Sequence, residues 1–292
     1  MMNTFKLLKH DIVYGTFRYK SILLAPLIFL FECLYCQAYI AIIMRHTDFQ
    51  APVTYIDYLV FLFRGMAPFS QETSPDGFHI PISWICLFGA SAITTLFYPL
   101  DDLDVKGEQV IVRSPGRIHW WLSKVTWNII TTTLFFALGY FVVYLFCILQ
   151  NGVLSLVNTP TLTSAFFLEL SVMPSTLQLA PEENLIHFFL LPMIVSVTLN
   201  LAQMTISIVT RPIIGFLATM STIILSTVWA HPALIGNYAM AMRTKPFLEN
   251  GVLVSFGFIL CLLVSFGSVM LGGFYFKTYD IFPKNHSSGG SI

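Results

Sequence analysis

The chain has 292 residues, of which 56% are hydrophobic and only 10% are charged, and its 15 Lys and Arg residues balance its 15 Asp and Glu residues. This composition excludes a water-soluble domain, because so few polar residues would not cover the surface of a soluble protein of this length. The zero net charge carries no information until the charges are assigned to the two sides of a membrane, and we expect no nucleic-acid partner.

The first predicted element precedes the long apolar stretches. From Phe5 to Tyr19, apolar side chains alternate irregularly with basic ones such as Lys6, Lys9 and Arg18. This mixture is typical of an interfacial helix on the inner leaflet, with its basic residues near anionic head groups. We therefore predict an interfacial helix within residues 1–20. A frayed cytoplasmic tail is the alternative.

Six apolar stretches of 19 to 26 residues follow, and each is long enough to cross roughly 30 Å of hydrocarbon as a helix. The predicted fold is therefore an all-α polytopic membrane protein, with residues 1–292 forming one transmembrane domain. The predicted spans are Ser21 to Met44, Ile80 to Leu100, Val125 to Leu149, Ile186 to Val209, Pro212 to Ala230 and Gly251 to Phe276.

The Lys and Arg residues are distributed unequally between the two sides. Eleven lie on the side that holds both termini, and four lie on the other: Arg45, Arg64, Arg243 and Lys245. The positive-inside rule then places both termini in the cytoplasm. We expect a multi-pass protein of the bacterial plasma membrane, with a cytoplasmic tail at residues 277–292.

Span one contains the clearest ionisable residue within an apolar stretch, Glu32, with Gln37 a little over one turn further on. A charged side chain at the bilayer centre costs at least about 2.5 to 3.5 kcal/mol on insertion scales, so such residues are functional candidates. We place Glu32 and Gln37 on a predicted substrate pathway. The alternative is a protonated Glu32 hydrogen-bonded to a neighbouring helix. Cys33 and Cys36 are predicted to pack as small apolar residues.

Three segments between the spans contain apolar stretches that are too short to cross the membrane. Tyr55 to Phe63 is predicted to lie at the membrane surface, and Gln150 to Asn184 is predicted to form short helices on the outer leaflet. Pro232 to Met242, which Gly236 and Asn237 interrupt, is predicted to dip into the membrane and return.

The segment between spans two and three, residues 101–124, is rich in charged side chains. Its last part is predicted to form a helix with Trp120, Trp121 and Lys124 at the inner membrane interface, where indole rings and cationic heads settle. We predict that this segment binds a soluble partner. A solvated loop that only anchors span three is the alternative.

Asn200 and Gln203 lie three residues apart on one face of span four, and they complete the predicted substrate pathway. Polar side chains of this kind also bridge membrane helices, at about 0.6 to 2 kcal/mol each. Interhelical packing is therefore the alternative for both residues.

Taken together, these features resemble the ABC-2 type permeases, the membrane subunits of bacterial ATP-binding-cassette exporters. The shared features are the amphipathic segment before span one, six spans with both ends inside, the charged segment between spans two and three, the two-residue connection Thr210–Arg211, and the re-entrant segment before span six.

The resemblance implies a coupling helix within Lys106 to Lys124 that docks on a separate ATPase, with Glu108, Arg113 and Arg117 as its contacts. It also implies two copies of that ATPase and a second permease chain, identical or homologous. No cofactor is expected in this chain, since ATP and Mg would be bound by the ATPase. Membrane lipids are the remaining expected partners.

Motifs of other protein classes are missing from the sequence. No G-x-x-x-x-G-K-[ST] sequence occurs, so nucleotide binding in the P-loop manner is not expected. No catalytic set or metal-ligand cluster is visible, so an enzyme is the least favoured class. The expected function is export of an amphipathic peptide, a lipid or a small toxic compound. The alternatives are an ATP-independent, ion-coupled carrier and a membrane protein that gives immunity to a toxin.

Overall fold

The structure is a computed structural model, and it describes residues 4–46, 51–68, 80–103, 116–167, 179–245, 247–248 and 250–278. Within these ranges the chain is helical, and its only β pairing is two isolated bridges. The α-helices are α1 (Thr4–Asp11), α2 (Leu24–His46), α3 (Tyr55–Phe63), α4 (Ile82–Leu96), α6 (Arg117–Leu149), α7 (Pro160–Phe166), α8 (Pro181–Leu185), α9 (Leu191–Val209), α10 (Pro212–Val228) and α11 (Val254–Thr278). Shorter 3-10 or π-helical pieces are η1 (Ile12–Arg18), η2 (Ser21–Leu23), η3 (Ile186–Leu190), η4 (Ile235–Ala239) and η5 (Ala241–Arg243).

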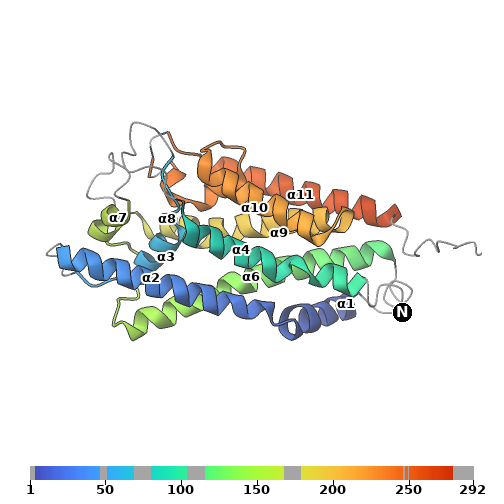
Figure 1. The fold of residues 1–292 in the computed structure, drawn as a ribbon, viewed down its shortest axis with the longest axis horizontal. Coiled ribbons are helices and arrows are strands. Elements are labelled where there is room, and N and C mark those ends of the chain that lie inside the picture. Colours follow the sequence, from blue (N-terminus) through green and yellow to red (C-terminus); the bar gives the residue numbers. More distant parts are fainter. Residues whose placement is uncertain are drawn as a thin grey trace, which may run out of the picture.

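The long helices form an elongated bundle with α4 and α9 between two outer groups (Figure 1). One group contains α2 and α6, and the other contains α10 and α11. The starts of α1, α6 and α10 and the end of α11 lie at one end, here called the basic end after Arg18, Arg117, Arg211 and Lys277. The short helices α3, α7 and α8 lie towards the opposite end.

Five helical stretches of the described chain are long and apolar enough to cross a membrane: Ser21–Arg45, Ile82–Leu103, Arg117–Leu149, Pro181–Val209 and Val254–Lys277. They coincide with five of the six predicted spans, so the architecture is that of a helical, multi-pass membrane protein. The other predicted span, Pro212 to Ala230, forms α10 of 17 residues. At 1.5 Å per residue α10 is about 26 Å long, slightly short of a full crossing.

The helix α10 ends early because the following segment folds back against it. The Trp229 backbone is extended, and η4 packs against α9, α10 and α11. Arg243, which is 1% exposed, donates hydrogen bonds to the Ser226 carbonyl and, at 2.6 Å, to the Thr227 carbonyl in the last turn of α10. The guanidinium thus caps the negative end of the α10 dipole. The predicted re-entrant segment is therefore buried in the bundle from Ile235 to Met242, whereas Pro232 and Ala233 are exposed.

The prediction for Tyr55 to Phe63 is wrong in its location. This segment forms α3, and every residue from Ile56 to Phe63 is buried by the bundle instead of lying at its surface. Thr54 and Asp57 form a capping box at its start. Asp57 also accepts hydrogen bonds from the Thr159 amide at 2.8 Å and the Thr159 hydroxyl at 2.7 Å. These bonds tie α3 to the start of α7.

The N-terminal helix within residues 1–20 is present, but it runs alongside α6. Asp11 forms an ion pair with Lys124, and the hydroxyl groups of Thr16 and Thr131 form a hydrogen bond at 2.8 Å. Both residue numbers increase from the first contact to the second, so the two helical segments run parallel, side by side. This packing argues against a helix that lies flat on a leaflet. It also corrects the prediction for the start of α6: Trp120, Trp121 and Lys124 are each at most 1% exposed, because neighbouring helices cover them.

Candidate functional site

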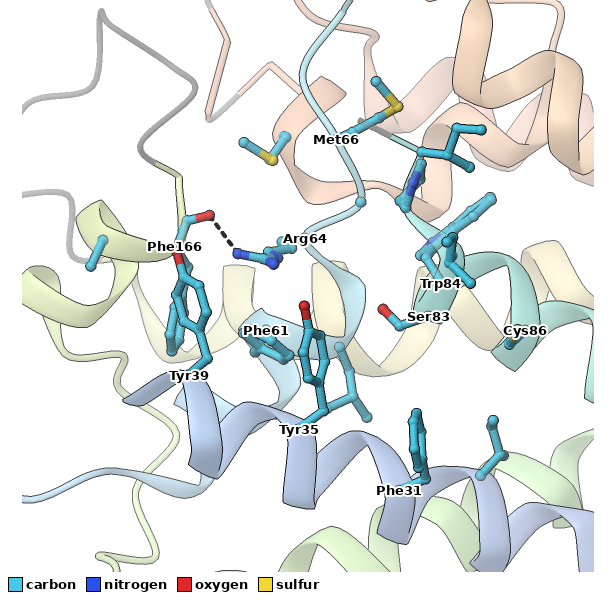
Figure 2. Close-up of a pocket in the computed structure, with 18 residues that line it drawn as sticks. Phe31, Tyr35, Tyr39, Phe61, Arg64, Met66, Ser83, Trp84, Cys86 and Phe166 are labelled. Carbon is cyan, nitrogen blue, oxygen red and sulfur yellow. Dashed lines mark hydrogen bonds between the residues drawn. The ribbon is translucent and has the colours of Figure 1, made fainter. Parts of the chain in front are cut away.

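A pocket of about 620 Å³ opens between α2, α3, α7 and the start of α4 (Figure 2). We call it the aromatic pocket, after the rings that line it: Phe31, Tyr35 and Tyr39 of α2, Phe61 of α3, Trp84 of α4 and Phe166 of α7. The Phe61 ring packs edge-on against Tyr35 and Phe166, with centroids 5.4 and 5.2 Å apart. These contacts hold the rings in place, so the pocket has a fixed apolar wall.

Arg64, directly after α3, brings a positive charge to this wall. Its Nη1 donates a hydrogen bond to the Phe166 carbonyl at 3.0 Å (Figure 2), and its guanidinium lies 4.4 Å from the Phe61 ring centroid and 5.3 Å from that of Tyr39. No carboxylate of the described residues forms an ion pair with Arg64. The ring faces and the carbonyl therefore stabilise the charge, and the guanidinium retains donors for an anionic or carbonyl group.

Glu32 lies behind the pocket wall, on the turn of α2 that also carries Phe31 and Tyr35. It is 1% exposed, and neither carboxyl oxygen has a hydrogen-bond partner within 3.5 Å among the described residues. The Ser83 hydroxyl of the pocket is near enough for a weak hydrogen-bonding interaction with the carboxyl group, and the charge of Arg64 also acts on it. A buried carboxyl without a close partner is costly, so its presence beside a pocket favours a role in binding or proton transfer.

Gln37 does not join Glu32 at the pocket. Their separation of five positions corresponds to about 140° around a helix, so the two side chains point in different directions. The Gln37 amide oxygen accepts a hydrogen bond from the Tyr58 hydroxyl at 2.8 Å. The contact that the structure gives Gln37 therefore connects α2 to α3.

Asn200 and Gln203 lie in a separate polar cluster between α4, α6 and α9. The Asn200 amide donates to the Thr132 hydroxyl at 2.9 Å and to the Ser91 hydroxyl at 3.2 Å, and the Gln203 amide donates to the Ala92 carbonyl at 2.8 Å. All of these groups are buried, and neither Asn200 nor Gln203 lines the aromatic pocket. These contacts favour the interhelical role, and a pathway role for the two residues stays a prediction.

The predicted ATPase contacts are only partly placed. Glu108 and Arg113 lie outside the described residues, which leave out 104–115, half of the segment 101–124. Arg117 is the first residue of α6, and its Nη1 donates to the Lys277 carbonyl at 3.1 Å. This bond holds the start of α6 to the end of α11 at the basic end.

Beside Arg117, the basic end contains a buried charge cluster that the sequence analysis missed. Lys124 Nζ lies 2.6 Å from Asp11 Oδ1 and 2.7 Å from Asp102 Oδ2. Nearby, the Tyr19 hydroxyl donates to Asp101, and partial burial together with this bond raises the pKa of Tyr19 to about 12. The signal for this cluster was present in the sequence, since Asp11 interrupts an otherwise basic and apolar segment.

Comparison of the chain with protein-family models, curated proteins and solved structures gives no match. The features that bear on function are therefore the architecture and the aromatic pocket with its two ionisable neighbours, Arg64 and Glu32.

Proposed function

We propose that this chain is the membrane-spanning permease subunit of an ATP-binding-cassette exporter in a bacterial plasma membrane. The observation that carries the proposal is a pocket of about 620 Å³ in a multi-pass helical bundle, with six aromatic rings, Arg64 on its wall and Glu32 buried behind it. Aromatic walls with a few placed polar groups are typical of sites for amphipathic molecules. The cargo is an amphipathic peptide, a lipid or a small toxic compound.

The order of the elements supports the permease assignment. An N-terminal helix precedes the first long helix, two residues connect α9 to α10, and a buried irregular segment precedes α11. In the proposal α10 is the fifth of six spans, and both termini lie in the cytoplasm. The unequal distribution of Lys and Arg supports this orientation.

ATP and Mg are bound by a separate ATPase in this proposal, in two copies, and a second permease chain completes the pathway. Residues 101–124 dock on the ATPase through Glu108, Arg113 and Arg117. Because α6 continues without a break from Arg117 to Leu149, a movement at the docking segment is passed along one rigid helix towards the end that holds the pocket. ATP then shifts the population between two arrangements of the bundle.

The pocket assignment is tested with exposed residues, whose substitution does not disturb the core. Phe31 is 59% exposed and Tyr35 is 46% exposed, and both line the pocket. Leu34 is 54% exposed on the same helix but does not line it, so it is the matched control. A host strain that lacks the chain is complemented with wild type, with F31A/Y35A or with L34A, and its tolerance to a panel of amphipathic peptides and small compounds is measured.

We expect deletion to sensitise the strain to at least one compound, wild type and L34A to restore tolerance, and F31A/Y35A to leave most of the sensitivity. Full restoration by F31A/Y35A, at equal membrane levels, contradicts the pocket assignment.

A second candidate is an ATP-independent, ion-coupled carrier. The observation in its favour is the lack of a close hydrogen-bond partner for Glu32 among the described residues, since such a carboxyl can bind and release a proton. The carrier requires transport that collapses with the proton gradient and survives ATP depletion. The exporter requires transport that survives collapse of the proton gradient and stops when ATP is depleted.

A further inference from the structure

A second cavity, far from the aromatic pocket, lies between the start of α6 and the end of α11 at the basic end. It has a volume of about 550 Å³, and apolar residues from both helices line it: Ile118, Trp121, Leu122, Met270, Gly273 and Phe274. Arg117 and Lys277 also line it. We call this cavity the α6–α11 groove.

Two glycines of α11 allow α6 to approach closely and shape this groove. A Cβ atom at Gly272 would overlap the Trp121 ring, so the ring lies directly on the α11 backbone. The Trp121 indole also donates a hydrogen bond to the Val269 carbonyl at 2.9 Å, which fixes its orientation. The groove floor is therefore a rigid surface rather than a gap between loosely packed side chains.

The charges of the groove are concentrated at one end. Arg117 is the first residue of α6, and Lys277 lies in the last turn of α11. The bond from Arg117 Nη1 to the Lys277 carbonyl, at 3.1 Å, keeps these two residues together. The apolar residues extend from this point along the membrane-spanning parts of both helices. The two positively charged residues and the apolar residues thus line one continuous groove.

We propose that the α6–α11 groove binds an anionic phospholipid of the inner leaflet, with its phosphate at Arg117 and Lys277 and an acyl chain along Leu122, Met270 and Phe274. Basic pockets between membrane helices bind anionic head groups through the same combination of charge and apolar contact. A free phosphate ion would make no use of the apolar residues. A zwitterionic lipid has no net negative charge, so the two positive charges would attract it more weakly than an anionic lipid. Lipid binding does not require the proposed transport function. In an exporter the several N–H donors of Arg117 would serve the Lys277 carbonyl, the lipid phosphate and the ATPase together.

The test is the number of lipids that stay bound to the purified full-length chain in native mass spectrometry, after reconstitution with vesicles of phosphatidylglycerol, phosphatidylcholine or both. The head-group site is removed with R117Q/K277Q, and K277Q alone leaves the bond from Arg117 to the backbone intact. K6Q/K9Q is the charge control, because both lysines are exposed near the basic end and lie outside the groove.

The apolar part is blocked independently with M270W. Met270 is 41% exposed and lines the groove, whereas Leu262 is 68% exposed on the same helix outside it, so L262W is the matched control. Thermal unfolding of each variant shows whether it is folded.

We expect wild type to retain phosphatidylglycerol at least tenfold over phosphatidylcholine, R117Q/K277Q to lose that preference, and K277Q to lose part of it. M270W should retain less of either lipid, and both controls should behave as wild type. Equal retention by folded R117Q/K277Q and wild type overturns the proposal. It is also overturned if M270W converts a dimer into a monomer without changing lipid retention, since a second copy of the chain then covers the groove.

Discussion

Lys124 of α6 and Asp11 of the N-terminal helix form a buried ion pair, with 2.6 Å between Nζ and Oδ1, and both residues are at most 2% exposed. The pair is well satisfied: the Ser123 hydroxyl and the Tyr98 hydroxyl also donate to Asp11, at 2.6 and 2.9 Å. Asp102, on the other side of the ammonium group, lies 2.7 Å away. These bonds connect three segments that are distant in the sequence.

Replacing Lys124 with Met should destabilise the protein by about 3 to 5 kcal/mol, because two buried carboxylates lose their cation. The control is K9M, since Lys9 is an exposed residue of the same helix as Asp11 and lies outside the cluster. Unfolding in detergent, followed by circular dichroism, measures the difference. The double variant D11N/K124M should recover part of the loss, because it removes one of the unpaired charges. An unfolding curve for K124M that coincides with that of K9M is incompatible with this prediction.

Replacing Arg243 with Met should loosen the end of α10 and the segment that follows it. The carbonyl of Thr227 and the side-chain oxygen of Asn237, each 2.6 Å from the guanidinium, would lose their donors while buried. Each buried group without a partner costs about 1 to 3 kcal/mol. Hydrogen exchange should increase at the end of α10.

R243K should be intermediate, because Lys keeps the charge but lacks the planar fork of donors. K245M is the control at an exposed neighbour. If R243M exchanges no faster than K245M, the capping role of Arg243 is wrong.

Gly139 of α6 lies directly against the Phe29 ring of α2, since a Cβ atom at this position would overlap the ring. G139A should therefore destabilise the protein by about 1 to 3 kcal/mol through overpacking. Gly267 of α11 has no neighbouring atom within 4 Å of the same added Cβ, so G267A should be neutral or slightly stabilising. Adding F29L to G139A should restore stability. Equal stability of G139A and G267A would show that the two helices are not in close contact here.

Transport by the variant E32Q distinguishes the two proposed functions. In the ATP-driven exporter, E32Q preserves the shape of the pocket, and transport should stay within a few fold of wild type. In the proton-coupled carrier, E32Q removes the proton site, and transport should be lost. The measurement is efflux of the compound identified by complementation, in cells with collapsed proton gradient and in cells depleted of ATP. Loss of efflux in E32Q together with resistance to ATP depletion would reject the exporter.

The length and composition of the apolar stretches were sufficient to predict the helical fold, because a long apolar segment has one stable form in a membrane. They were insufficient for α3, whose nine residues are equally compatible with a surface helix and a buried one. The end of α10 is capped by Arg243, which approaches from a segment more than ten residues later. Contacts of this kind are not encoded in a local pattern.

The candidate site was predictable only in part. Glu32 was identified because a carboxyl in an apolar stretch is conspicuous, and the structure places it beside the aromatic pocket. Arg64 was counted only as a charge on one side of the membrane, and its position over Phe61 depends on the fold of α3. Asn200 was grouped with Glu32 because both are polar residues in spans, whereas its contacts lie between three helices away from the pocket.

The proposed exporter requires a separate ATPase that drives this chain. The most direct measurement is to tag the chain in its native host, purify it in mild detergent, and identify the co-purifying proteins and their stoichiometry by mass spectrometry. The exporter predicts a soluble ATPase with a P-loop at one copy per permease chain. Its reproducible absence, from preparations in which the permease is folded and transport-competent, would contradict the account.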